Sequence, residues 1–120
     1  MQTKYQVDAS VGPVLKSCAI GVLLLFHSFT AYADQLLAQE KNCMACHAVG
    51  RKLVGPSFEA VAQRYAGLRG AQSSIAASML SGSTGKWGAA SMPPQSNLNA
   101  SDAERLAGWI LSFQSAAATH

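Results

Sequence analysis

Five consecutive residues constrain this chain more than any others, because Cys43-Met44-Ala45-Cys46-His47 forms a C-x-x-C-H motif. Two thiols at this spacing can each form a thioether bond to one vinyl group on a single porphyrin edge. The histidine after the second cysteine is then carried to the iron, where its imidazole can serve as an axial ligand. The motif therefore predicts a c-type haem attached through Cys43 and Cys46, with His47 bound to the iron.

Other interpretations of a C-x-x-C motif fit this chain less well. A structural zinc site takes four ligands, whereas the chain has three cysteines and three histidines, and Cys18 and His27 lie in a segment that we expect to be removed. A thioredoxin-like redox motif requires a surrounding βαβ pattern, and the sequence shows none. Chance occurrence of so short a motif is the remaining alternative.

The first 33 residues have the pattern of a secretory signal peptide. Lys4 and Lys16 flank a polar start, residues 19–26 form an apolar run, and Ala31-Tyr32-Ala33 offers small residues where a signal peptidase cuts. The alternative is an uncleaved membrane anchor, but the apolar run is shorter than the ~20 residues that a spanning helix needs. We therefore expect a signal peptide over residues 1–33 and one periplasmic domain over residues 34–120.

The composition of residues 34–120 agrees with an exported haem protein. Both of their cysteines belong to the haem motif, so no disulfide can stabilise the domain. A domain of this size has a marginal hydrophobic core, and a covalently held porphyrin would supply the missing apolar surface. The net charge is small and positive, which is too weak a signal for nucleic-acid binding. We expect no nucleic-acid partner, and no stable membrane insertion after cleavage.

The hydrophobic pattern predicts an all-α domain of about four helices, without strands. A first helix begins near Asp34 and turns Leu36, Leu37 and Ala38 inward. Two more helices span residues 57–65 and 71–81, and the latter buries Ile75, Met79 and Leu80. The last helix begins at a capping box over Ser101-Asp102-Ala103-Glu104 and runs to about residue 114, followed by a frayed tail.

A long segment without helical period, residues 83–99, separates the last two expected helices. Loops of this length in compact domains are usually functional. This one contains Met92, followed by Pro93 and Pro94, and a thioether suits the open iron face of a haem held by one histidine. Because Met44 lies between the haem cysteines and Met79 on a helix face, Met92 is the candidate for the second axial ligand.

The order of these features resembles a known family. The matching segments are Cys43 to Ala48, Val54-Gly55-Pro56, Gly82 to Gly88 and Met92-Pro93-Pro94, together with Trp109 in the last helix. They are similar to the small bacterial class I cytochromes c of the cytochrome c-551 group, also called cytochrome c8. The resemblance implies the cytochrome c fold, in which the first and last helices cross and the helices wrap around one covalently bound haem with an exposed edge.

The resemblance also implies roles for individual residues. It assigns the covalent bonds to Cys43 and Cys46 and the axial positions to His47 and Met92. The carbonyl of Pro56 is expected to accept a hydrogen bond from the far ring nitrogen of His47, which fixes the tautomer of the imidazole.

Three further positions bear on the haem surroundings. The indole N–H of Trp87 is expected to reach a haem propionate, the alternative being an ordinary core tryptophan. Ser78 stands where the family often has an arginine near the propionates, and Gln95 where it often has an asparagine that touches the methionine sulfur. Both departures bear on the redox potential and leave the axial ligands unaffected.

The function implied by the resemblance is electron transport. With both axial positions occupied, no substrate reaches the iron, so we expect a monomeric carrier of single electrons and not an enzyme. Respiratory redox proteins would dock transiently at the exposed haem edge. Two other functions stay open: a tightly held haem subunit of a larger oxidoreductase complex, and a gas-sensing or peroxidase-like protein with an open iron site.

Overall fold

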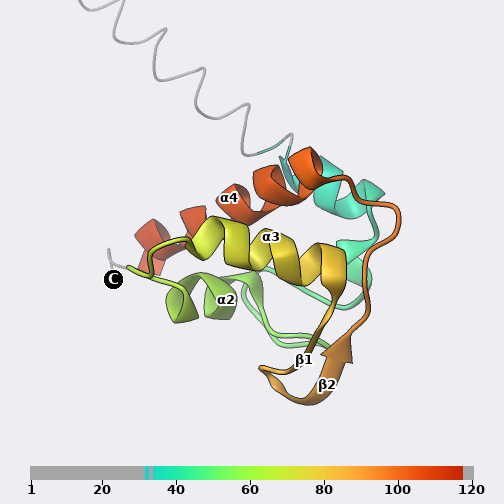
Figure 1. The fold of residues 1–120 in the computed structure, drawn as a ribbon. Helices are drawn as coiled ribbons and strands as arrows, with labels where there is room; N and C mark the ends of the chain where they lie inside the picture. Colours follow the sequence, from blue (N-terminus) through green and yellow to red (C-terminus); the bar gives the residue numbers. More distant parts are fainter. Residues whose placement is uncertain (1–31, 33, 118–120) are drawn as a thin grey trace, which may run out of the picture. The chain divides into compact units, whose positions relative to one another are not determined.

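The structure, a computed structural model, describes residue 32 and residues 34–117. The predicted signal peptide therefore lies outside the described residues, apart from Tyr32. The described part is mostly helical, as predicted, with one small sheet (Figure 1). None of its helices combines the length and the apolar character that crossing a membrane requires.

The haem motif follows a short helical segment at residues 34–40 and is itself folded as the 3-10 helix η1 (Cys43–Ala45). Between them, Asn42 has a φ of 61°, a left-handed conformation that asparagine tolerates better than most residues. Ala38 is fully buried, whereas Leu36 is 46% exposed, so the expectation that Leu36 faces inward is wrong. Leu36 and Ala38 are two positions apart, and residues at this spacing do not lie on the same face of a helix.

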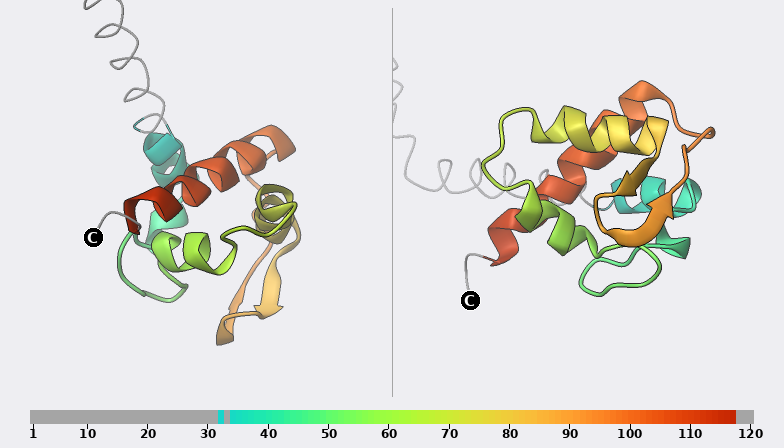
Figure 2. Two further views of the ribbon diagram at one scale, coloured as in Figure 1. Left: turned by 90° about the vertical axis from the view of Figure 1, so that its left-hand side faces the viewer. Right: turned by 60° about the horizontal axis from the view of Figure 1, so that its bottom comes forward.

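Helix α2 (Phe58–Arg64) forms where the apolar period predicts it. Ser57 caps the helix, because its side-chain oxygen accepts a hydrogen bond from the backbone N–H of Ala60 at 3.1 Å. The buried face consists of Phe58, Val61 and Ala62. The helix packs against the last helix of the chain, and Figure 2 shows the two ribbons close together in both of its views.

Helix α3 (Ala71–Ser81) has the predicted bounds and also packs against the last helix. It buries Ile75 and Met79, but Leu80 is 36% exposed, which contradicts the expected burial of Leu80. Leu80 lies one position beyond the i, i+4 stripe that Ile75 and Met79 define, and this turns it toward solvent. The helix ends at Gly82, whose φ of 77° favours glycine.

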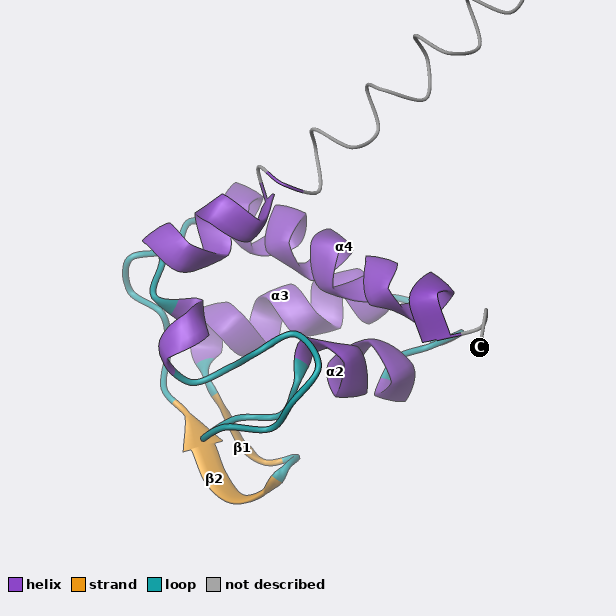
Figure 3. Ribbon diagram, turned by 180° about the vertical axis from the view of Figure 1, so that it is seen from behind, coloured by secondary structure: helices purple, strands orange, loops and turns teal. Residues whose placement is uncertain are grey.

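The expectation of a loop without strands over residues 83–99 is wrong for its first half. Strands β1 (Ser83–Gly85) and β2 (Gly88–Met92) form an antiparallel hairpin, which projects from the helices in Figure 3. Gly85 and Gly88 flank the connection with φ values of 73° and 92°. The two glycines allow a tight reversal, and the exposed, small residues of β2 left no apolar alternation to reveal the strand.

Helix α4 (Ala100–Ala117) is the longest element and runs beyond the predicted end near residue 114. Its N-terminal cap is Asn99, two residues earlier than predicted. Asn99 Oδ1 accepts a hydrogen bond from the Asp102 N–H at 2.8 Å, and Asn99 Nδ2 donates to Asp102 Oδ2 at 3.0 Å. Ion pairs join α4 to the 34–40 segment, from Arg105 to Asp34, and to the turn that follows it, from Asp102 to Lys41.

Candidate haem site

A cavity of ≈ 530 Å³ opens between the helices, the hairpin and the segment that follows η1. Several of the most buried core residues form its wall, namely Phe58, Ile75, Met79, Leu98, Leu106, Trp109 and Ile110. Among the described residues that line it, Lys52 and Lys86 carry charge at neutral pH and none is acidic. The core of this domain therefore surrounds an apolar cavity, and the charged side chains at its edge are positive.

Both cysteines of the motif line this pocket as free thiols. The tight turn of η1 brings them to one edge, since the His47 N–H donates to the Cys43 carbonyl at 3.0 Å and the Cys46 N–H donates to the same oxygen at 3.3 Å. Cys43 is half-buried and Cys46 is exposed. Before a ring is attached, burial raises the pKa of the Cys43 thiol, against a smaller lowering by a backbone hydrogen bond.

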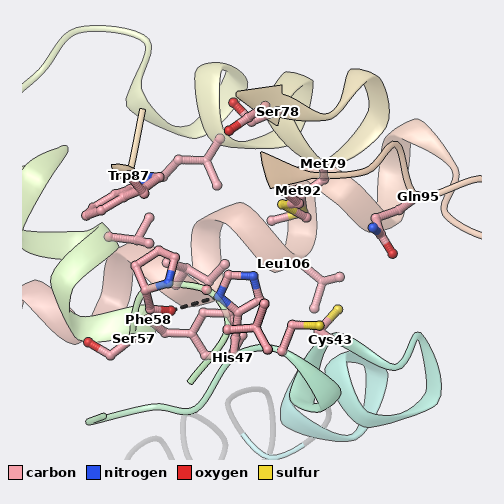
Figure 4. A pocket seen from close by; sticks show the side chains of 18 of the residues that line it. Cys43, His47, Ser57, Phe58, Ser78, Met79, Trp87, Met92, Gln95 and Leu106 are labelled. Carbon is pink, nitrogen blue, oxygen red and sulfur yellow. Dashed lines mark hydrogen bonds between the residues drawn. The ribbon is translucent and has the colours of Figure 1, made fainter. Parts of the chain in front are cut away.

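The imidazole of His47 is fixed from two sides. Its Nδ1 lies 2.8 Å from the carbonyl oxygen of Pro56, so the expected contact between these residues is present (Figure 4). Because a carbonyl can only accept, Nδ1 carries the proton, and the lone pair is left on Nε2. The ring also stacks on Phe58 at 5.3 Å between centroids, and Trp109 meets Phe58 edge-on. These aromatic contacts were not predicted from the sequence.

Gly55 packs directly against the same imidazole, and Gly55→Ala should displace it. A Cβ at residue 55 would lie 2.4 Å from His47 Cε1 and 2.8 Å from each ring nitrogen. We expect a loss of about 1–3 kcal/mol in the free energy of unfolding and a changed ferric spectrum, measured by thermal unfolding and visible absorption. Gly50→Ala is the control, because a Cβ there meets only the flexible Glu59 carboxylate, at 3.3 Å. Equal behaviour of the two variants would contradict this packing.

Met92 ends β2 and lines the pocket, which it enters from the side opposite His47 in Figure 4. Close packing holds its backbone: a Cβ at Gly82 would lie only 2.8 Å from the Met92 carbonyl oxygen. The chain just beyond it is tied to α3, since the Gln95 N–H donates to the Met79 carbonyl at 2.9 Å. Met79 belongs to the core, as expected, but its side chain also reaches the pocket wall. The pocket thus offers two thioether groups.

A cluster of four residues, Arg64, Ser78, Lys86 and Trp87, lies at the hairpin end of the pocket, and we call it the Trp87 cluster. The guanidinium of Arg64 lies 4.5 Å from the Trp87 ring centroid, a cation–π contact. Arg64 also donates a hydrogen bond to the Lys86 carbonyl. Lys86 Nζ donates to Ser78 Oγ at 3.0 Å. Trp87 is partly buried and packed against the core, while its ring lines the pocket.

Comparison with known proteins identifies the family. The cytochrome c family matches residues 33–114. The chain belongs to the cytochrome c family. Its relatives include cytochrome c-552 of Hydrogenobacter thermophilus, 43% identical over 83 residues that cover 69% of this chain and 84% of the relative. Cytochrome c-551 of Pseudomonas aeruginosa is 38% identical over 99 residues, which cover 82% of this chain and 93% of the relative. These relatives place the cytochrome among the class I c-type cytochromes of the c-551 group.

A solved structure agrees with this assignment. The crystal structure of Nitrosomonas europaea cytochrome c552 superposes with a TM-score of 0.63 at 43% sequence identity, covering 64% of this chain and 95% of that one. The cytochrome c fold predicted from the sequence is therefore confirmed, and covalently bound haem c is the cofactor.

The pocket of this cytochrome fits haem c on three grounds. Its wall is apolar, as the faces of a porphyrin require. Two free thiols lie at one edge, beside a nitrogen ligand, and thioether sulfur is available elsewhere in the wall. The charged lining residues, Lys52 and Lys86, suit a ring that carries two carboxylates.

Proposed function

We propose that this cytochrome is a soluble, monomeric carrier of single electrons in the periplasm, with His47 and Met92 as the axial ligands. The observation that carries the proposal is the convergence of an oriented imidazole and a thioether on one apolar pocket. The two groups come from separate segments, the turn after η1 and the end of β2. Relatives that are small cytochromes c-551 and c-552 support the same function.

The residues that line the pocket have separate roles in such a carrier. Cys43 and Cys46 would hold the ring by thioether bonds. Pro56 orients His47 so that Nε2 faces the pocket, and Met92 supplies a soft ligand that favours the reduced state. Bound haem c supplies a one-electron couple. With both ligands in place no coordination site is open, so we assign electron transfer and no catalysis of its own.

Residues at the open side of the pocket suggest where redox partners dock. Val54 is 61% exposed, and Cys46, Ala90 and Ser91 are exposed as well, although all four line the pocket. A partner that covers them would approach the haem edge without a conformational change in the carrier. We expect a transient complex with a small interface, below about 1,200 Å².

Native extraction tests the proposed carrier against the alternatives. From a periplasmic fraction, the haem protein should elute from gel filtration as a free monomer and take up one electron per haem reversibly in a redox titration. Its intact mass should equal residues 34–120 plus one haem. Co-elution with a larger oxidoreductase would favour the subunit alternative, and a mass that retains residues 1–33 would favour a membrane-anchored cytochrome.

A further inference from the structure

The Trp87 cluster brings the cation of Lys86 close to Ser78, a position at which the sequence departs from the family that it resembles. Ser78 on α3 stands where, by the resemblance, the family often has an arginine. Helix α3 itself therefore offers no cation there. Yet Lys86 Nζ lies 3.0 Å from Ser78 Oγ, delivered from the connection between β1 and β2. The positive charge missing from the helix is thus supplied by the neighbouring hairpin.

The position of Lys86 is fixed by contacts from two helices. Arg64 of α2 donates a hydrogen bond to the Lys86 carbonyl while its guanidinium covers Trp87, and this holds the connection in place. Ser78 Oγ donates to the Ser74 carbonyl at 3.0 Å, so its lone pairs are free to accept from Lys86. Although Lys86 is exposed, its ammonium is thereby directed to one edge of the pocket.

Lys86 also has no anionic partner among the residues that the structure describes. The ion pairs among the described residues involve Asp34, Glu40 and Asp102, and none of them includes Lys86 or Arg64. No acidic side chain is among the described residues that line the pocket. A directed ammonium at the edge of an apolar pocket, with only a neutral hydroxyl beside it, is a site suited to a carboxylate of the ligand.

We propose that Lys86 binds one haem propionate, at the place where the resemblance implies that the family often has an arginine, and that Arg64 acts as a positioning residue through Trp87 and the Lys86 carbonyl. The inference rests on the proposed haem site, but not on the identity of the second axial ligand or on electron transfer. With Cys43 and Cys46 bonded to the haem and His47 assigned to the iron, the other titratable or charged side chains among the described lining residues are Lys52 and Tyr65.

The test is an NMR pH titration of the two haem propionate carboxyl groups in the ferric holoprotein. A cation beside a carboxylate lowers its pKa, so Lys86→Gln should raise the apparent pKa of one propionate by roughly one pH unit. Lys86→Arg, which keeps the charge, should leave it unchanged. Arg69→Gln is the matched control, because it removes the same net charge at an exposed position between α2 and α3. Restoring a cation on α3 in the double variant Lys86→Gln/Ser78→Lys should lower the pKa again.

Two results would overturn the proposal. In the first, both propionates of Lys86→Gln titrate as they do in Arg69→Gln. In the second, Lys52→Gln shifts the same propionate while Lys86→Gln does not, which would assign the contact to Lys52. Because the readout needs only a bound haem, it remains valid even if Met92 proves not to bind the iron.

Discussion

Replacing Met92 with alanine should lower the midpoint potential of the cytochrome by roughly 100 mV or more, within the ~0.8 V range over which axial ligands tune haem. The reason is that a thioether stabilises ferrous iron relative to ferric iron, and no other strong ligand lies in residues 83–99 to replace it. Lys86 is a poor substitute, because an ammonium group has no lone pair to offer the iron. The variant should also lose the weak near-infrared sulfur-to-iron charge-transfer band of the ferric protein.

Met79→Leu is the matched control for this experiment, since Met79 is the other thioether that reaches the pocket. Leucine has nearly the same volume as methionine, so the buried position should tolerate the change with a small loss of stability. The control should keep both the band and the potential. If Met79→Leu loses the band while Met92→Ala keeps it, the sulfur ligand is Met79 and our assignment is wrong.

The double variant Cys43→Ala/Cys46→Ala should lose covalent haem and, with it, most of its stability. Acid-acetone extraction should leave the colour on the wild-type protein and remove any colour from the variant. The structural reason for the loss of stability is that Phe58, Leu106 and Trp109 line the pocket as well as forming the core. Without the ring, these residues would border an empty cavity. A domain of this size has too small a core to compensate for the lost packing.

Cys18→Ala serves as the control, because Cys18 lies in the proposed signal peptide. It should leave the colour and the thermal unfolding of the mature protein unchanged. Free extraction of the colour from the wild-type protein would contradict covalent attachment through Cys43 and Cys46.

Local patterns predicted the helices well, because each helix carries its own signals. Ser57 and Gly82 mark the start of α2 and the end of α3 by the capping preferences of serine and glycine. The hairpin escaped prediction because its strands are short, and the pairing of Ser83 with Met92 is visible only once the chain has folded. The cap at Asn99 was missed because Ser101 and Glu104 offered a capping-box pattern two residues later.

The sequence allowed candidate site residues to be predicted where they belong to contiguous motifs, but not where tertiary contacts bring them in. The cysteines and His47 share one turn, so their spacing alone predicts that they lie together, and all three line the pocket. Phe58 behind the imidazole and Arg64 over Trp87 come from α2, and their contacts with the pocket depend on how that helix packs. Lys86 could have been noticed as a cation beside Trp87, but its approach to Ser78 depends on the turn between β1 and β2.

Exposure of the reduced wild-type protein to carbon monoxide tests the central claim most directly, because carbon monoxide binds ferrous haem only where an axial position is open. With His47 and Met92 both bound, the visible spectrum should stay unchanged on addition of the gas at neutral pH. Rapid binding by the wild-type protein, seen as an immediate spectral shift, would contradict the account. It would show an open iron site and favour a gas-sensing or peroxidase-like function over that of an electron carrier.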